Sequence, residues 1–223
     1  MKTNIMLIAL SVLAQRCIIA GPHYSDWSEP VNLGPAINSS ANDNHPAISK
    51  DGLSLYITSN RPGGYGGDDI WVSQRARTEA QWGPPRNLGP NINTASDDGV
   101  PTLSHDGHWM FFGTTRPGGF GGSDIWASYR QHTHDDFGWQ PPVNLGPGVN
   151  TATDEDGPTL FEDEESGVIP LYFTSLNRAG GLGDWDIYAS TFDGETMFEP
   201  AVLVSELSVP GTASNGRDTR TAI

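Results

Sequence analysis

The chain has 223 residues, a formal net charge of −15 at pH 7 and a glycine and proline content (27 and 17 residues) typical of a turn-rich protein. This length suits one domain, with or without a targeting segment. The negative charge argues against the basic surface that nucleic acids and anionic lipid headgroups require. Cys17 is the single cysteine, so neither a disulfide framework nor a cysteine zinc site is expected. Arg16 before it disfavours a lipid anchor.

The first predicted element is an export signal at residues 1–20. Lys2 precedes an apolar run from Ile5 to Ala14, which is too short to span a bilayer and has the length of a signal-peptide core. Cleavage could follow Ala14 or Ala20, and the alternative is a buried N-terminal strand or helix. We therefore expect a periplasmic or secreted protein with no membrane span after signal removal.

The rest of the sequence contains an internal repeat of about 55 residues. The near-copies WSEPVNLGPAIN, WGPPRNLGPNIN and WQPPVNLGPGVN begin at Trp27, Trp82 and Trp139, and a degenerate copy begins at Phe198. Short β-branched and aromatic runs between Asp-Gly, Pro and Gly-Gly predict strands and hairpins, while no segment has helical periodicity. Four strands in each repeat predict an all-β fold, a β-propeller of four-stranded antiparallel blades.

Two consecutive motifs in each repeat resemble a known family. PAISKDG at 46–52 and SNRPGGYGGDDIW at 59–71 are similar to the WD-like (PD-type) repeat of TolB-like bacterial β-propellers. The resemblance extends over about residues 27–223 and implies a periplasmic or exported scaffold. It also implies a register with blades at about 46–89, 101–146 and 158–205, an orphan outer strand at 27–33 and the start of a fourth blade at 218–223.

Three full blades form an incomplete propeller, because closed rings have four to eight. An open stack would expose unpaired strand edges, which favour aggregation. We therefore expect the chain to be a fragment of a longer protein. The alternative is an oligomer in which several chains complete one ring.

The glycine-rich turns, of which residues 60–67 are the first, raise the question of a phosphate-binding loop. Such a loop requires a helix after its glycines, whereas here a strand follows. The aspartates after the turns are instead predicted to build the blade, by accepting hydrogen bonds from loop amides or by pairing with the arginines before the turns. The residues assigned to this repeated framework are Asp69, Asp124, Asp186, Trp71 and Trp126.

The candidate binding site is the face where up-and-down connectivity brings the inter-blade loops beside the glycine turns. Acidic loops, three arginines, a histidine near the channel mouth and two aromatic turn tips are predicted to lie there. Clustered carboxylates and Asn carbonyls could hold calcium, although EF-hand spacing does not occur; the alternative is a solvated acidic rim. The members of this face are Asp43, His45, Arg61, Tyr65, Asp97, Asp98, Arg116, Phe120, Asp154, Asp156 and Arg178.

No catalytic constellation is visible in the sequence. The GxSxG elbow and the sialidase turn do not occur, and abundant carboxylates do not define a glycosidase pair. His132 and His134 have spacing that a metal could use, but we place them in an exposed loop. We therefore expect a non-enzymatic scaffold that binds a protein or glycan partner at the cell envelope. The alternatives are the propeller of a secreted carbohydrate-active or peptidase enzyme, and a structural spacer of an envelope protein.

Overall fold

The structure is a computed structural model that describes residues 28–161, 168–192 and 198–208. The chain divides into two compact units, Met1–Asn32 and Leu33–Ile223, and the second contains every strand discussed below. Within the described residues there is no helix, and hence none that is long and apolar enough to cross a membrane.

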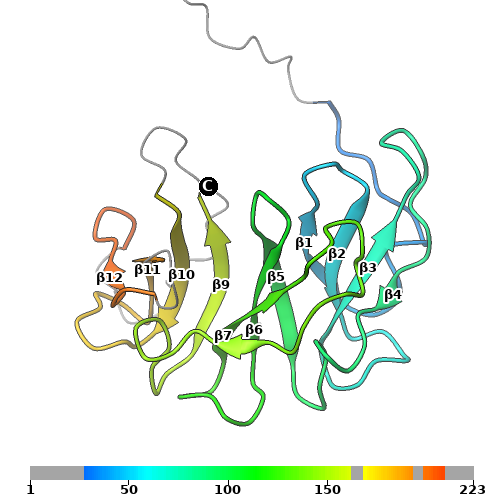
Figure 1. The fold of residues 1–223 in the computed structure, drawn as a ribbon. Helices are drawn as coiled ribbons and strands as arrows, with labels where there is room; N and C mark the ends of the chain where they lie inside the picture. The colour runs from blue at the N-terminus through cyan, green and yellow to red at the C-terminus, as the bar shows by residue number, and fades with distance from the viewer. Residues whose placement is uncertain (1–27, 162–167, 193–197, 209–223) are drawn as a thin grey trace, which may run out of the picture. The chain divides into compact units, whose positions relative to one another are not determined.

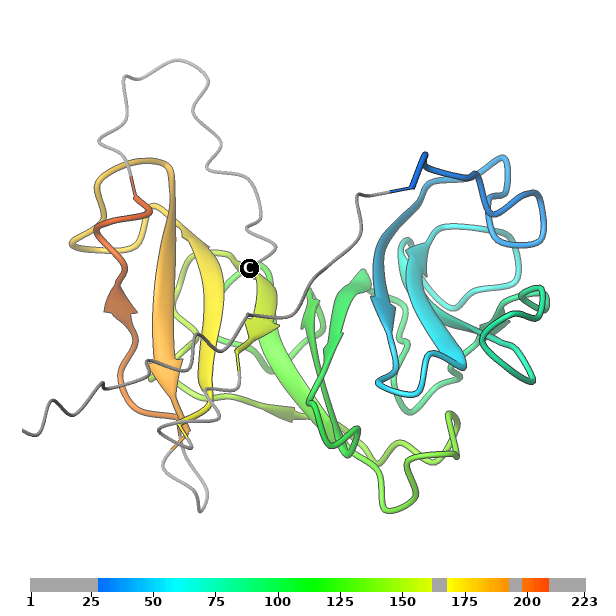
Figure 2. The same ribbon diagram turned by 90° about the horizontal axis from the view of Figure 1, so that it is seen from above.

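The described strands form three four-stranded antiparallel sheets, and each sheet is one sequence repeat (Figures 1 and 2). Within every sheet the strands are adjacent in chain order, so each repeat folds as an up-and-down blade. Blade 1 contains β1 (Asp43–Ile48), β2 (Ser54–Ser59), β3 (Asp69–Gln74) and β4 (Arg86–Asn87). Blade 2 contains β5 (Asp98–Leu103), β6 (Trp109–Thr114), β7 (Asp124–Tyr129) and β8 (Val143–Asn144). Blade 3 contains β9 (Glu155–Leu160), β10 (Pro170–Leu176), β11 (Trp185–Thr191) and β12 (Val202–Leu203).

This arrangement confirms the all-β fold of propeller blades. Residues 28–33, the described part of the outer strand predicted at 27–33, are not in a strand. The export signal predicted at 1–20 and the blade start predicted at 218–223 lie outside the described residues.

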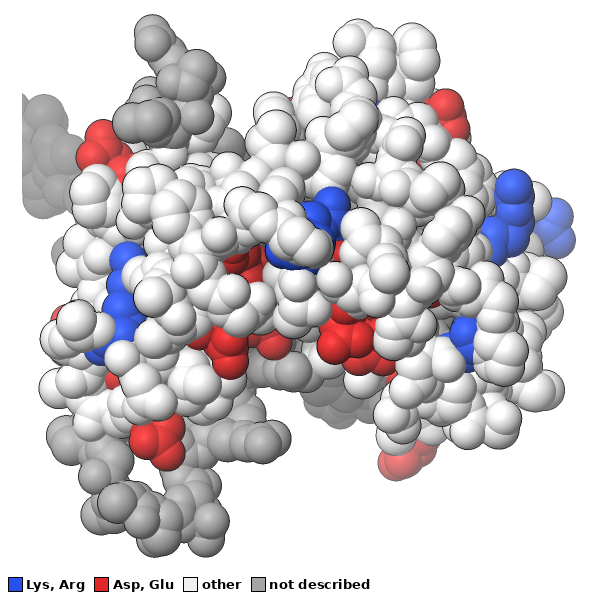
Figure 3. Space-filling view, turned by 90° about the horizontal axis from the view of Figure 1, so that it is seen from below, with Lys and Arg blue, Asp and Glu red and all other residues white. Residues whose placement is uncertain are grey.

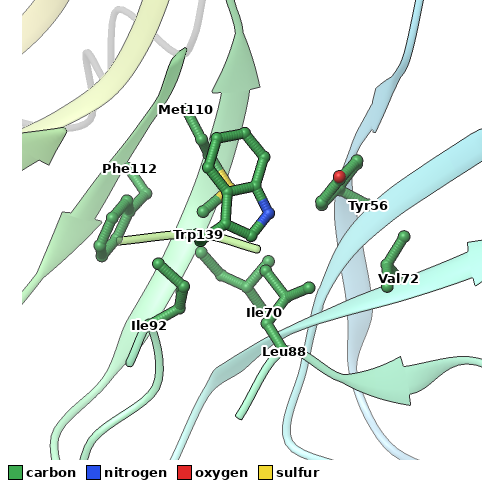
Figure 4. Close-up of a cluster of buried hydrophobic side chains, with 8 residues drawn as sticks. All are labelled: Tyr56, Ile70, Val72, Leu88, Ile92, Met110, Phe112 and Trp139. Atoms are coloured by element: carbon green, nitrogen blue, oxygen red, sulfur yellow. The ribbon is translucent and has the colours of Figure 1, made fainter. Parts of the chain in front are cut away.

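Blade stacking buries the core, because a single four-stranded sheet cannot bury both of its faces. Side chains alternate along each strand, so Met110 and Phe112 of β6 face blade 1, while Phe111 between them faces blade 3. The cluster between blades 1 and 2 consists of Tyr56, Ile70, Val72, Leu88, Ile92, Met110, Phe112 and Trp139 (Figure 4). The cluster between blades 2 and 3 consists of Phe111, Ile125, Ala127, Val149, Leu171, Phe173 and Tyr188.

Candidate functional site

The predicted binding face is built by contact between each glycine turn and the next inter-blade loop. The amide of Asp98 donates to the carbonyl of Asp68 at 2.8 Å, and the amide of Glu155 donates to the carbonyl of Ser123 at 2.8 Å. A Cβ atom on Gly66 would collide with the carbonyl oxygen of Ser96. The second pair of glycines in the turn is therefore required for two loops to touch, and not for a phosphate.

The aspartates after the turns accept hydrogen bonds from the amides of their own turns. Asp69 accepts a hydrogen bond from the amide of Tyr65 at 2.6 Å, and Asp124 accepts one from the amide of Phe120 at 2.5 Å. Asp186 accepts the corresponding bond from Leu182 at 2.7 Å. Burial raises the pKa of Asp69. Loop amides, rather than the arginines, are therefore the observed partners of these carboxylates.

The same framework includes the tryptophans of the third strands. Trp71 is buried, and its indole nitrogen donates to the carbonyl of Ser59 at 3.1 Å. Trp126 is half-buried against the cluster between blades 1 and 2. Both side chains therefore contribute to packing between strands and blades.

The arginines pair with acidic residues that begin the first strands. Arg61 lies 2.5 Å from Asp43 and Arg116 lies 2.7 Å from Asp98, and the side chains of both pairs are largely shielded from solvent. Asp98 is fully buried. The sequence analysis assigned these four residues to the candidate binding face, whereas in the structure they pair with one another inside blades 1 and 2.

The third blade repeats this arrangement with a glutamate. Arg178 lies 3.9 Å from Glu155, which is fully buried and accepts a hydrogen bond from Ser175 at 2.7 Å. The sequence places Glu155 in the same acidic loop as Asp154 and Asp156, but the candidate binding set contains only these two neighbours. The available signal was position, since Glu155 precedes Pro158 by the same spacing as Asp98 precedes Pro101.

Each arginine also ties its blade to the loop that enters it. Arg116 donates to the carbonyl of Ile92 at 2.5 Å, and Arg61 makes the equivalent bond to Ile37 at 2.7 Å. Arg178 donates to Val149 at 2.7 Å. Each guanidinium therefore joins a buried carboxylate to a turn carbonyl, which is a structural role.

The other predicted residues remain accessible on this face. Tyr65 and Phe120 at the turn tips are 51% and 48% exposed. Asp97 is exposed, and Asp154 and Asp156 are half-buried. Figure 3 views the molecule from below and shows carboxylates gathered near the middle of the surface. The structure thus separates the predicted set into buried ion pairs and a smaller accessible group.

One acidic residue that the sequence analysis did not single out belongs to the accessible group. Asp68 is half-buried, and its amide donates to the carboxylate of Asp97 at 3.1 Å. Burial and the negative charge of Asp97 raise the pKa of Asp68, while His45 acts in the opposite direction. A group with these neighbours prefers to accept a proton or a hydrogen-bond donor.

A cavity of about 330 Å³ lies between the three first strands. Equivalent residues of the three first strands line this cavity. His45 contributes a polar side chain where the other blades have Val100 and Gly157. The remaining lining residues are Pro46, Ala47, Ile48, Pro101, Thr102, Leu103, Pro158 and Thr159.

The backbone around this cavity is strained. His45 and Val100 have φ values of 47° and 54°, and the equivalent Gly157 has 64°. The strand register shifts at the same places, which identifies a β-bulge in each first strand. The amide of Val100 donates to the hydroxyl of Thr58 in the preceding blade at 2.8 Å, which holds the bulge in place. Left-handed backbone at a β-branched residue is rare and clusters at functional sites.

Metal ligation finds no support in the described part of the chain. No three His, Cys, Asp or Glu side chains among these residues are grouped to hold an ion. His134 is exposed, 3.7 Å from the carboxylate of Asp51. The predicted calcium site therefore has no ligand set within the ranges that the structure describes.

No protein-family model matches this sequence, and no curated protein matches it. Solved structures do. An α-L-arabinofuranosidase from Lactobacillus brevis aligns with a TM-score of 0.55 and 16% identity, over 81% of this chain and 57% of that one. A thermostable family-43 glycoside hydrolase aligns with a TM-score of 0.50 and 13% identity, over 75% of this chain and 54% of that one.

These similarities establish the β-propeller fold. The chain spans about half the length of the two hydrolases. TolB from Acinetobacter baumannii also aligns, over 74% of this chain and 33% of that one, with 15% identity and a TM-score of 0.46, which is too low to support a specific relationship. The general prediction of a bacterial-type propeller is therefore confirmed, whereas the specific resemblance to TolB stays a prediction.

Proposed function

We propose that this unit is the propeller portion of a carbohydrate-active protein, and that it binds a glycan in the cavity between the first strands. The observation that carries the proposal is this cavity, which has a left-handed bulge in each first strand and the imidazole side chain of His45 in its lining. Its volume of about 330 Å³ lies at the lower end of the range for small-ligand sites, about 300–1,000 Å³.

The chemistry of the lining suits a sugar. A sugar ring has apolar C–H faces and a hydroxyl rim, and the cavity offers proline and aliphatic surface beside polar groups. Pro46 and Pro101 supply part of the apolar surface, and His45 and Thr102 supply the polar groups. Asp68, whose carboxylate interacts electrostatically with His45 and Asp97, adds an acceptor for hydroxyl donors.

The solved neighbours point in the same direction. One of them, a GH43_1 enzyme from Xanthomonas citri, is complexed with xylotriose and aligns with a TM-score of 0.50 and 14% identity. For this chain we propose glycan binding rather than hydrolysis, since Asp43, Asp98 and Glu155 are engaged by arginines and hydroxyls. Export, as the segment 1–20 predicts, would place the unit where extracellular glycans occur.

Titration calorimetry with xylotriose, arabino-oligosaccharides and cello-oligosaccharides tests the proposal. We expect at least one series to bind, and His45→Ala to weaken its binding by about tenfold, the loss of roughly one hydrogen-bonded contact. His105→Ala is the matched control, because His105 is exposed in the β5–β6 turn, away from the cavity lining.

The outcomes separate the alternatives. Absence of binding to all three series, or equal weakening by both histidine variants, would contradict a glycan site in the cavity. Release of 4-nitrophenol from aryl arabinosides or xylosides by the wild-type chain would show that the unit also hydrolyses glycosides.

A protein partner is the second candidate, and exposed apolar turn tips favour it. Tyr65, Phe120 and Leu182 occupy equivalent tips, and Leu182 is 41% exposed. Tyrosine and phenylalanine are enriched at protein interfaces. A triple serine variant that binds glycans normally but no longer retains a protein captured by the wild-type chain would support this function; unchanged capture would oppose it.

A further inference from the structure

A second cavity lies between blades 2 and 3, apart from the proposed glycan site. It has a volume of about 300 Å³ and shares no lining residue with the cavity between the first strands. Aromatic side chains from both blades surround it: Trp109 and Phe111 from β6, and Phe192 and Phe198 from the region after β11. The carboxylate of Asp106, in the turn between β5 and β6, also lines it.

The aromatic rings form a continuous wall. The ring centroids of Phe111 and Phe198 are 6.0 Å apart and perpendicular, and those of Phe192 and Phe198 are 5.4 Å apart. The ring centroids of Trp109 and Phe111 are 6.4 Å apart. These separations are typical of favourable aromatic pairs, so the rings hold one another in position.

The corresponding position between blades 1 and 2 is filled by a polar network. Ser54, Tyr56 and Gln74 of blade 1 each donate a hydrogen bond of 2.6 Å to Asp136 of blade 2. Arg130 lies 2.7 Å from the same carboxylate. At that junction the buried polar groups are therefore hydrogen-bonded to one another.

The residues at the second junction are equivalent in position but different in chemistry. Ser54 and Gln74 form a cross-strand pair in blade 1, and Trp109 and Tyr129 form the equivalent pair in blade 2. Two isolated bridges match in the same way, Arg130 with Trp139 and Phe192 with Phe198. Aromatic residues thus replace the serine, tyrosine, glutamine and arginine of the first junction. The junction between blades 2 and 3 therefore contains a cavity where the first junction contains a hydrogen-bonded network.

This cavity is accessible rather than sealed. Trp109 is 37% exposed and Phe192 is 42% exposed, and the neighbouring Ile169 is 41% exposed. Large apolar side chains that line a hollow and remain partly exposed are typical of ligand-binding sites.

The carboxylate gives the cavity a charged end. Asp106 is exposed, and it accepts hydrogen bonds from the hydroxyl of Ser104 at 2.5 Å and from the amide of His108 at 3.0 Å. Burial alone would raise the pKa of Asp106, but these two bonds outweigh it and the pKa is lowered. The carboxylate is therefore ionised at neutral pH, in a chain whose net charge of −15 attracts cations.

We propose that this cavity binds an aromatic amine, with the ring among Trp109, Phe111, Phe192 and Phe198 and the ammonium group at Asp106. The aromatic wall supplies the apolar contact, and its ring faces also attract a cation. The carboxylate selects against an aromatic acid of the same size. The ligand class follows from the two ends of the cavity and does not depend on the proposed glycan function.

The test uses three small probes on the full chain: phenethylamine, 3-phenylpropionate and butylamine. Chemical-shift titration is expected to show phenethylamine binding with a Kd on the order of 1 mM, as for small ligands in general. The acid, which lacks the cation, and butylamine, which lacks the ring, are expected to bind at least about fivefold more weakly.

Two variants locate the binding. Asp106→Asn keeps the turn acceptor and removes the charge, and it should abolish the preference for the amine over the acid. Asp51→Asn is the matched control, because Ser49 and Asp51 form the same turn in blade 1, with a hydroxyl-to-carboxylate distance of 2.6 Å. Asp51→Asn should leave both affinities unchanged.

The proposal fails if the three probes bind equally or if none binds at 10-fold the expected Kd, on the order of 10 mM. It also fails if Asp51→Asn has the same effect as Asp106→Asn, since the preference would then reflect only the net charge. Thermal melts of both variants establish that each is folded before the affinities are compared.

Discussion

Val100 occupies a backbone conformation that valine rarely adopts. Its φ of 54° is matched by 64° at the equivalent Gly157, so the bulge itself imposes the left-handed geometry. An L-residue in this region costs about 1–2 kcal/mol, a cost from which glycine is exempt. His45 and Val100 both carry this strain, and both line the cavity between the first strands.

The strain predicts an inverted ranking of glycine and alanine at position 100. In ordinary strand or helix positions glycine is less stable than alanine by about 0.5–1 kcal/mol. Here Val100→Gly is expected to have a free energy of unfolding about 1 kcal/mol higher than Val100→Ala. Urea denaturation of the two variants measures the difference, and the usual ranking would contradict the strain.

Asp43 makes the folded state sensitive to acid. Burial alone raises its pKa, but hydrogen bonds from Ser59, Ser39 and Arg61 outweigh burial and hold the pKa at about 2. Because the folded pKa lies below the ordinary value of 3.8, this group stabilises the fold above pH 3.8 and loses that contribution as the pH falls toward 2.

We therefore expect Asp43→Asn to be less stable than the wild type at pH 7 and to lose less stability between pH 4 and pH 2. Urea midpoints across this range measure the effect. Parallel losses in the two proteins would show that other carboxylates control acid unfolding.

Individual residue roles were only partly predictable from the sequence. Asp69 was assigned to the framework, because a residue that recurs after every turn is most simply a building residue. Connectivity placed Asp98 on the loop face but could not show its burial, because its neutralising partner Arg116 is 18 residues away in sequence. The burial of Glu155 in the same kind of loop was equally hidden from the sequence.

At the scale of the elements, the junction between blades 1 and 2 depends on one buried carboxylate. Asp136 is 2% exposed and accepts hydrogen bonds from three side chains of blade 1. Its partner Arg130 is stacked on Trp139, with the guanidinium carbon 4.4 Å from the ring centroid. Breaking a buried pair leaves a charge without compensation, at a cost of about 3–5 kcal/mol.

Asp136→Ala is accordingly expected to lower the free energy of unfolding by about 3–5 kcal/mol. Asp135→Ala is the matched control, because the adjacent Asp135 is exposed and should cost no more than about 1 kcal/mol. Urea denaturation of both variants decides, and similar losses would mean that Asp136 does not join the blades.

The strands themselves were readable from the sequence, because apolar runs between turn residues recur in every repeat. The junctions were not, since Gln74 and Asp136 belong to different repeats and nothing local relates them. The bulges were also invisible, because His45 and Val100 are not residues that normally signal left-handed backbone. Contacts between blades therefore needed the structure.

At the scale of the whole molecule, the charge of −15 opposes the compact state. Salt screens repulsion between exposed carboxylates beyond about 10 Å at 0.1 M ionic strength. Ion pairs such as Arg130 with Asp136 are buried, so salt weakens them much less.

The melting temperature is therefore expected to rise when sodium chloride increases from 10 mM to 150 mM at pH 7. At pH 4.5, near the sequence pI, the same addition should have little effect. Differential scanning calorimetry makes both measurements, and a fall in melting temperature at pH 7 would mean that exposed attractive pairs dominate.

The fold could be predicted from the sequence while the function could not, for one physical reason. Repetition reveals what every blade needs, such as Asp69 and its counterparts, and so reports assembly. Binding depends on departures from the repeat, such as His45 or the aromatic replacement at Trp109, whose meaning appears only when the blades are side by side.

The reach of blade 2 back onto blade 1 also has a consequence for synthesis on the ribosome. Gln74 and its partner Asp136 are 62 residues apart, which corresponds to about 3–12 s of translation at 5–20 residues per second. During that interval the nascent chain has Tyr56, Ile70 and Val72 but not yet Trp139, which completes the cluster around them. Codon choice between positions 74 and 136 thus sets how long a newly made blade is open to association with neighbouring chains.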